Sequence, residues 1–309
     1  MNSPVNILVA YPYFKRPVLD FIKRQRRDTY RLIVDSGAFS AWNIGKQITL
    51  DEYCKFLESI GSISPFKAVQ LDVIGNPEAT WKNFLIMKKR GFDVMPVFTR
   101  GDTIERLDEM YEHTDYIMFG GIVSGEGNLQ YIKWFMERNK GRKVHWLGFC
   151  NADFVKHFKP YSVDSSSWAS GSRFGTIHLY KGFGHLTSFH RSKFLTHPSK
   201  KIYEIAKKSG IGDEEIALLQ AKNSWIETTA VPSLIKPEKG TAKMLGCIAS
   251  MHRAYDVEKN LGTQFYLAAA AAHQLEMIFE SRKFLIRKGI IQDVKTKTVR
   301  RAKREEVSL

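Results

Sequence analysis

Three aspartates stand where apolar, strand-like runs of the sequence stop. Asp164 follows Val163 and precedes a serine-rich stretch, Asp35 follows residues 32–34, and Asp72 follows Leu71. A carboxylate can act as a nucleophile that forms a covalent intermediate, as a general acid or base, or as a hydrogen-bond acceptor for a ligand. The repetition predicts one site assembled from several strands, with Asp164 as its nucleophile.

The residues around two of these aspartates allow more than one interpretation. Phe39 follows Asp35 closely enough to stack on a planar ligand that the carboxylate contacts. Asp35 is also well placed to cap the turn that Ser36 and Gly37 begin, and this structural alternative stays open. The serines after Asp164 do not form the Gly-x-Ser-x-Gly elbow of serine hydrolases, so the carboxylate is the better nucleophile.

A glycine-rich run at residues 119–127 includes Gly120 and Gly121. Glycine lets backbone N–H groups approach a ligand closely, although a tight turn without a ligand gives the same pattern. The run matches neither the phosphate-loop motif nor the dinucleotide fingerprint. Four histidines between His178 and His197 also match no common metal-site spacing, so we expect no metal and no cofactor.

The elements that must position these residues alternate between strand and helix. Strand-like runs occur at residues 7–10, 32–34, 68–74, 94–98, 116–123, 144–149 and 161–163. Amphipathic helical patterns lie at residues 50–60, 77–90, 103–113, 129–139 and 152–158. This α/β alternation predicts a parallel sheet, and residues 176–180 as an eighth strand favour a TIM (β/α)8 barrel over a doubly wound sheet. In that fold the active site lies at the carboxyl ends of the strands.

The chain is expected to divide near residue 197. Residues 1–197 would form the barrel core, and residues 198–309 a C-terminal helical region that completes or flanks the barrel and ends in a basic tail. Two short helices are predicted within 198–220, and one long helix or a broken pair within 241–288. The three cysteines are too far apart in sequence to form a metal clip, so no zinc-binding subdomain is expected.

A formal net charge of +15 over 309 residues indicates a nucleic-acid partner, because Lys and Arg release counterions from a polyanion. A basic protein without such a partner is the alternative. Arg173, Lys181, Arg191 and Lys193 are the predicted phosphate contacts, although the segment that carries most of them also resembles a solvated loop. No apolar run approaches the roughly 18 residues that span a bilayer, and no signal peptide is evident, so a cytoplasmic protein without a membrane partner is expected.

Taken in order, these motifs resemble those of the tRNA-guanine transglycosylase superfamily, TIM barrels that exchange guanine in a nucleic acid for a 7-deazaguanine. Residues 35–39 are similar to the family's Asp-Ser-Gly-Gly-Phe/Tyr motif, and residues 120–126 to its Gly-Gly-Leu-Ala-Val-Gly-Glu motif. Residues 145–149 resemble its Tyr-Leu-Met-Gly-Val run, and residues 164–173 its Asp-Cys-Val-x-Pro-Thr-Arg-x-x-Arg motif. The resemblance covers about residues 30–175.

The resemblance implies a role for each matching residue. Asp164 would be the nucleophile, and Asp35 the proton donor and acceptor. The residues that would bind the purine are Ser36, Phe39, Asp72, Gly120, Gly121, Leu147 and Gly148. Among them, Asp72 would read the purine edge, while Phe39 and Leu147 would lie on opposite faces of the ring. Arg173 matches the second arginine of the last motif.

Two departures from the family pattern point to DNA rather than tRNA. Ser170 replaces the first arginine of the last motif, and the Cys-x-Cys-x-x-Cys…His zinc module of the tRNA enzymes is absent. The chain looks more like the phage DpdA-type DNA transglycosylases, which would act in the host cytoplasm. The expected partners are DNA and a free 7-deazaguanine such as preQ0, and the involvement of accessory proteins stays open. The alternatives are a tRNA-guanine transglycosylase, a base-removing hydrolase and a non-catalytic nucleic-acid-binding barrel.

Overall fold

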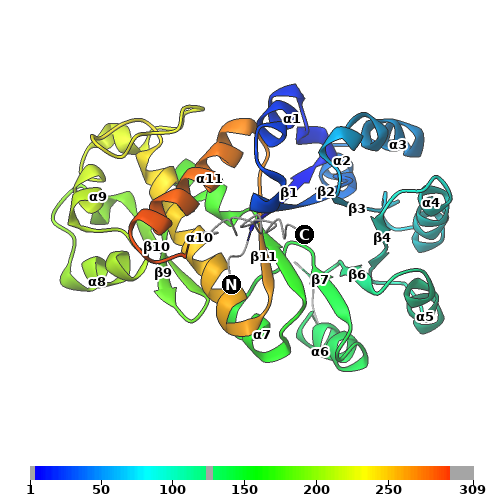
Figure 1. Cartoon of the computed structure of the whole chain (residues 1–309). Coiled ribbons are helices and arrows are strands. Elements are labelled where there is room, and N and C mark those ends of the chain that lie inside the picture. The colour runs from blue at the N-terminus through cyan, green and yellow to red at the C-terminus, as the bar shows by residue number, and fades with distance from the viewer. Residues whose placement is uncertain (1–3, 123–127, 293–309) are drawn as a thin grey trace, which may run out of the picture.

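The computed structural model describes residues 4–122 and 128–292, and its centre is a parallel β-sheet that curls round on itself (Figure 1). The strands of this sheet are β1 (Val5–Ala10), β2 (Tyr30–Asp35), β3 (Lys67–Val69), β4 (Val94–Met95), β5 (Val97–Phe98), β6 (Tyr116–Phe119), β7 (Lys143–Trp146), β8 (Ser162–Ser165) and β11 (Gln264–Ala268). Neighbouring strands follow the order β4, β3, β2, β1, β11, β8, β7, β6, β5.

The two end strands of this order are halves of one extended segment. β4 pairs with β3 and β5 pairs with β6, and only Pro96 separates the two halves. Proline has no N–H to donate, but its carbonyl accepts a hydrogen bond from the Met118 N–H at 2.8 Å. The sheet therefore comes almost full circle. The predicted α/β class is confirmed, and the nearly closed parallel sheet is compatible with a TIM-like barrel.

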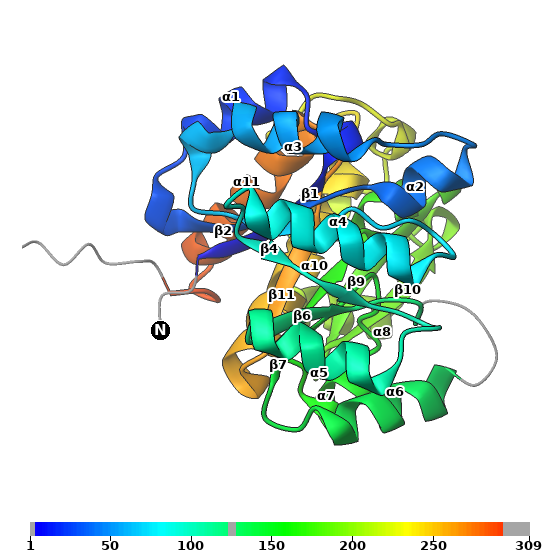
Figure 2. The same cartoon turned by 90° about the vertical axis from the view of Figure 1, so that its right-hand side faces the viewer.

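Helices cover the outside of the sheet (Figures 1 and 2). They are α1 (Arg16–Lys23), α3 (Leu50–Ser59), α4 (Pro77–Lys89), α5 (Ile104–His113), α6 (Asn128–Arg138), α7 (Ala152–Phe158), α10 (Thr241–Leu261) and α11 (Ala272–Arg287). Local sequence fixes where several of them begin. Thr49 and Glu52 form a capping box at the start of α3, and the Asn76 side chain caps α4 just before Pro77. The helices predicted before residue 160 are confirmed.

Alternate side chains of the strands belong to two different cores. On β8, Val163 packs outward under the helices, whereas Ser162 and Asp164 have the opposite orientation. Inside the barrel lie the apolar side chains of Leu8, Ile33, Val69, Met95, Val97, Tyr116, Met118 and Tyr266. The period of two along a strand therefore brings polar residues at inward positions into the barrel, where they meet residues from other strands.

The predicted eighth strand of the barrel is wrong. Residues 176–180 do form a strand, β9 (Thr176–Gly182), but it pairs antiparallel with β10 (His185–His190) in a separate two-stranded sheet. Its apolar side chains, among them Ile177, are buried against α10. The place in the barrel is taken by β11, which pairs with both β8 and β1. An alanine-rich run at residues 268–272, typical of helix, concealed this strand.

The chain between β8 and α10 forms a layer on the outer side of α10 (Figure 1). This layer contains the β9–β10 hairpin and two short helices, α8 (Lys200–Lys208) and α9 (Asp213–Leu218). The pair of short helices predicted within 198–220 is thereby confirmed. In the part of the chain that is described, no helix combines the length and the apolar character needed to cross a bilayer.

Candidate active site

Asp164 lies inside β8, one position before the strand ends, and is 7% exposed. Its Oδ1 accepts a hydrogen bond of 2.7 Å from the backbone N–H of Gly148, and the Nε2 of His145 lies 3.2 Å from the same oxygen. Gly148 has a φ of +65°, a conformation that glycine adopts without strain. Among the described side chains and backbone groups of residues 4–122 and 128–292, the two donors to Asp164 therefore both bind Oδ1. Oδ2 is left for a ligand.

A line of hydrogen bonds continues from Asp164 into the barrel. The Nδ1 of His145 lies 2.6 Å from the Ser162 hydroxyl, which in turn lies 2.5 Å from the Tyr116 hydroxyl. His145 and Ser162 face each other in the pairing of β7 with β8. Neither has exposed surface. Strand pairing thus assembles Tyr116, Ser162, His145 and Asp164 into one buried row.

Asp35 ends β2, and its Oδ2 accepts a hydrogen bond of 3.2 Å from the Gly37 N–H. Gly37 has a φ of +71°, and a Cβ added there would lie 2.4 Å from the Pro12 ring, so the tight turn requires glycine. Burial, followed by the negative charge of Asp164, raises the pKa of Asp35 to about 6. Asp35 therefore holds a proton more readily than an ordinary aspartate does.

Asp72 follows β3 and receives a hydrogen bond of 3.2 Å from the Gln70 side chain. Burial raises the pKa of Asp72 to about 7, and the charges of Asp35 and Asp102 act in the same direction, while the Gln70 hydrogen bond opposes them. The fold thus brings Asp35 within electrostatic range of both Asp72 and Asp164. Their gathering from three strand ends is what the sequence pattern predicts, whereas their roles stay predictions.

The glycine-rich run and the Leu147 segment adjoin each other. A Cβ added to Gly120 would lie 3.7 Å from Leu147, and one added to Gly121 would lie 3.1 Å from the Thr99 hydroxyl. The Leu147 N–H also donates to the carbonyl of Phe119. Leu147, Gly120 and Gly121 therefore share one side of the barrel end. The remainder of the predicted run, residues 123–127, lies outside the described residues.

Phe39 and Ser36 flank the turn after Asp35. Ser36 is buried, whereas Phe39 lies on the short helix α2 (Ala38–Asn43) and is 62% exposed. The Phe39 ring stacks on Trp42, with 6.2 Å between ring centroids and an interplanar angle of 28°. The structure thus places Phe39 on the surface beside Asp35, and its stacking on a base stays a prediction.

The predicted phosphate contacts all lie in the segment that follows β8 and are exposed. Arg173 is in a 3₁₀ helix (Gly171–Phe174), Lys181 is in β9, and Arg191 and Lys193 are in a second 3₁₀ helix (Arg191–Lys193). The backbone N–H of Arg191 donates to the carbonyl of Gly175, so the two 3₁₀ helices lie close together. The fold brings Arg173 near Arg191, and the contact of these side chains with phosphate stays a prediction.

Residue-by-residue reasoning missed several polar groups of the site. The sequence motifs include His145 and Gln70 only as members of longer runs, and they assign no role to Ser162 or Tyr116. The sequence does hold a signal for His145 and Ser162, because each is a polar residue that alternates with large apolar residues in a buried strand. Such a residue must face the barrel interior, where it needs a partner.

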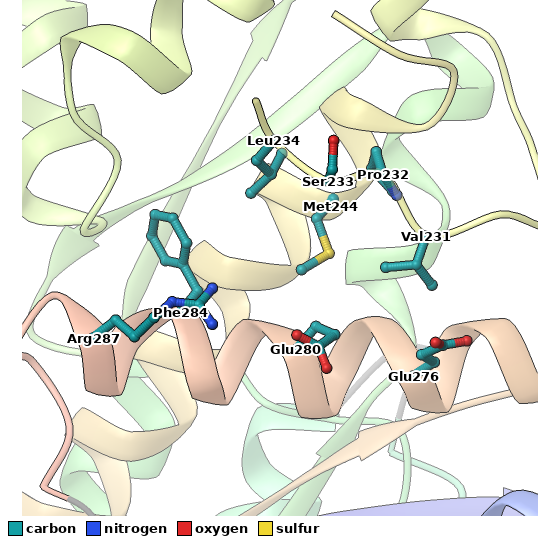
Figure 3. Close-up of a pocket in the computed structure, with 9 residues that line it drawn as sticks. All are labelled: Val231, Pro232, Ser233, Leu234, Met244, Glu276, Glu280, Phe284 and Arg287. Carbon is teal, nitrogen blue, oxygen red and sulfur yellow. The ribbon is translucent and has the colours of Figure 1, made fainter. Parts of the chain in front are cut away.

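Two further features of the described chain concern possible ligands. No group of three or more His, Cys, Asp or Glu side chains is arranged to hold a metal ion. A pocket of about 240 Å³ lies between α10, α11 and the Val231–Leu234 loop (Figure 3). Glu276, Glu280 and Arg287 of α11 line this pocket, and none of the predicted site residues does. It is therefore distinct from the carboxylate cluster.

Comparison of the chain with family models, curated proteins and solved structures finds no significant match. A functional interpretation therefore depends on the sequence motifs and on the geometry of the carboxylate cluster. In the part of the chain that is described, Oδ2 of Asp164 has no recorded hydrogen-bond partner, and the charge of Asp164 acts on Asp35, whose pKa is raised to about 6. Two carboxylates of unequal proton affinity are the kind of pair that retaining glycosyl transfer uses.

Proposed function

We propose that the protein is a DNA-guanine transglycosylase that exchanges guanine in DNA for a 7-deazaguanine derivative such as preQ0. The observation that carries the proposal is the pairing of Asp164, whose Oδ2 has no partner among the described side chains, with Asp35, whose pKa is raised to about 6. The two carboxylates are close enough for the charge of Asp164 to act on Asp35. Retaining glycosyl transfer uses such a pair, one group as nucleophile and the other as acid and base.

In the first half-reaction, Oδ2 of Asp164 attacks the deoxyribose C1′ of a target guanosine. The C1′–N9 bond breaks, its electron pair leaves with guanine, and Asp35 donates a proton to the departing base. The product is an aspartyl-deoxyribose ester together with free guanine. A target base within a duplex must first leave the stack, at a cost of a few kcal/mol that contacts with the DNA backbone offset.

The second half-reaction runs in the opposite direction with a different base. Asp35, now ionised, removes the proton from the incoming 7-deazaguanine, whose nitrogen attacks C1′ and displaces Asp164 as a carboxylate. Two inversions at one carbon retain its configuration. Because the same group must give a proton and then take one, a pKa near 6 suits Asp35 better than the ordinary value of 3.8.

The base would be held by the residues around these carboxylates. Asp72 would accept hydrogen bonds from the purine N–H groups, and Leu147 with Gly120 would line one side of the ring. Phe39 would cover the other face after a turn of its exposed side chain. These assignments follow the resemblance to the transglycosylases and agree with the positions of the residues at one end of the barrel.

Charge and surface chemistry support a nucleic acid as the substrate. The chain carries a formal net charge of +15, and Phe39 and Trp42 form an exposed stacked pair one turn after Asp35. Exposed aromatic rings beside basic groups are typical of sites where unpaired bases stack. DNA is preferred to tRNA because the sequence lacks the zinc module of the tRNA enzymes. A helical region after residue 197 and the lack of a zinc subdomain belong to the same proposal.

A base-exchange assay tests the proposal. Guanine-containing DNA and, separately, tRNA are incubated with a labelled 7-deazaguanine, and the nucleosides are analysed by mass spectrometry. We expect incorporation into DNA by the wild-type protein and a loss of at least about 10³-fold for Asp164→Asn. Asp153→Asn is a matched control, because Asp153 is an exposed carboxylate whose recorded ion pair is with His185.

Each other outcome supports a different function. Incorporation into tRNA alone would identify a tRNA transglycosylase, and abasic sites that form without a supplied base would identify a hydrolase. Salt-dependent DNA binding without exchange would indicate a non-catalytic binding protein. Full incorporation by Asp164→Asn would overturn the assignment of the nucleophile.

A further inference from the structure

The buried row from Tyr116 to Asp164 connects the interior of the barrel with the carboxylate that is proposed as the nucleophile. Its side chains come from three strands, β6, β7 and β8, and Tyr116 is 6% exposed while His145 and Ser162 have no exposure. Because water does not reach these groups, each must find its hydrogen-bond partner within the row. The protonation of one member is therefore linked to that of the next.

The order of protons along the row follows from the chemistry of its ends. Burial raises the pKa of Tyr116 well above 10, so its hydroxyl keeps its proton and can donate to the Ser162 oxygen. Ser162 then directs its own proton to the Nδ1 of His145, which must be unprotonated to accept it. A neutral imidazole with a bare Nδ1 carries its proton on Nε2, 3.2 Å from Oδ1 of Asp164.

We infer that His145 is a positioning residue for Asp164: a neutral imidazole, held in one tautomer by Ser162 and Tyr116, whose Nε2–H orients the nucleophile. The inference rests on the proposed function of Asp164. The Nε2–H of His145 and the N–H of Gly148 both donate to Oδ1 of Asp164, and this turns Oδ2 toward the reacting carbon. A neutral donor orients the carboxylate without forming an ion pair with it, so the negative charge that attacks C1′ is preserved.

The alternative is a charged imidazolium, with Nδ1–H donating to Ser162 and both ring nitrogens protonated. The charged and titratable groups that face the ring decide between the two states. They are Asp164 on β8, Tyr116 on β6 and Tyr266 on β11, whose ring centroid lies 5.8 Å from that of His145. Asp35 acts on the same cluster through Asp164. The Tyr116–Ser162 pair decides it, because Tyr116 donates to Ser162 and the Ser162 hydroxyl then donates to Nδ1, which leaves no room for a proton on Nδ1.

The tautomer can be measured without any catalytic assay. Nitrogen-15 NMR of the histidine-labelled wild-type protein, with His145 assigned through His145→Gln, reports the protonation of each ring nitrogen. At pH 7 we expect a bare Nδ1 and a protonated Nε2, and in Ser162→Ala a changed Nδ1 shift. A protonated Nδ1 in the wild-type protein at pH 7 would overturn the inference. This readout does not depend on whether the protein exchanges bases.

Kinetics then test whether the row acts through Asp164. Gln at position 145 keeps a side-chain N–H donor, whereas Ala removes it, so we expect kcat to fall less than about 10-fold in His145→Gln and about 10²-fold in His145→Ala. KM for DNA should change little in either variant, because His145 is fully buried. His157→Ala, which removes an exposed histidine on α7, is the matched control.

Tyr116→Phe keeps the ring of residue 116 and removes only the first donor of the row. It therefore tests the inference even if His145→Ala fails to fold. We expect kcat to fall about 3- to 10-fold with an unchanged KM, because Ser162 loses the donor that fixes its direction. An unchanged kcat in both folded Tyr116→Phe and His145→Gln, or a rise in KM that accounts for the whole loss, would contradict the positioning role.

Discussion

The two ends of the barrel arrange their charged side chains in opposite ways. At the carboxyl end, Asp35 lies within electrostatic range of Asp72 and Asp164, so like charges gather. At the amino end, Arg31 of β2 forms an ion pair of 2.9 Å with Glu258 of α10, and Asn6 of β1 hydrogen-bonds to both. Asn6 and Arg31 face each other in the pairing of β1 with β2. Like charges repel one another at the carboxyl end, whereas opposite charges form an ion pair at the amino end.

The difference indicates that the amino end contributes to stability, whereas the carboxyl end is suited to the proposed reaction. The Arg31–Glu258 pair joins residues far apart in sequence and fastens the first strands to the helix that precedes β11. The carboxylate cluster does not stabilise the fold in this way, because burial and mutual repulsion disfavour the charged forms of its members. Perturbed carboxylates of this kind are what the proposed active site requires, and they lower the stability of the folded protein.

The largest expected effect comes from neutralising the acid of the carboxyl end. Asp35→Asn removes the proposed proton donor and acceptor, so the proposed base exchange should fall about 10²- to 10⁴-fold. The same change should stabilise the fold at high pH. The pKa of Asp35 is about 6 in the folded protein and 3.8 as a model value, so wild-type stability falls as pH rises between these values.

Denaturant unfolding of wild-type and Asp35→Asn proteins at pH 4 and pH 8 measures the effect on stability. At pH 8 the variant should gain up to about 3 kcal/mol in free energy of unfolding, and at pH 4 little. Asp93→Asn is a suitable control, since Asp93 is an exposed carboxylate paired with Lys67. A loss of stability in Asp35→Asn at pH 8 would show that this end of the barrel is not strained by charge.

An intermediate effect is expected from breaking the pair at the amino end. Glu258→Gln leaves Arg31 without its counter-charge, and because the Arg31 side chain is 40% exposed, the loss should be about 1–2 kcal/mol rather than that of a fully buried pair. Exchange per folded molecule should not change. Asp28→Asn breaks the exposed Arg26–Asp28 pair instead and should cost less than about 0.5 kcal/mol. Equal losses in the two variants would remove the distinction.

The smallest expected effect concerns the surface beside the carboxyl end. Trp42→Ala removes half of the exposed Phe39–Trp42 pair, and the Kd for single-stranded DNA should rise about 5- to 10-fold. Ile86→Ala is the control, because Ile86 is 42% exposed in the last turn of α4. Fluorescence anisotropy at fixed salt measures both. A similar Kd for Trp42→Ala and the wild type would show that DNA does not stack on this pair.

The strand pattern of the first 165 residues could be predicted well, because most of its strands are short, mainly apolar runs, and polar residues stand at or just after the ends of β2, β3 and β8. The carboxylates Asp35, Asp72 and Asp164 were found through those ends. The predicted ends of the strands were less accurate. The run at residues 68–74 is a strand only over Lys67–Val69, and Asp164 lies within β8 rather than after it.

Sequence by itself determined most of the strands and helices in the first 165 residues and the carboxylates at or near strand ends, since both follow from local periodicity. Tertiary structure alone decided which strand closes the barrel, because β11 pairs with β1 across nearly the whole chain, as in the contact of Ile7 with Leu267. It also decided that His145 meets Asp164, since that contact needs the register of β7 against β8. Strand pairing is non-local, and no short window of sequence encodes it.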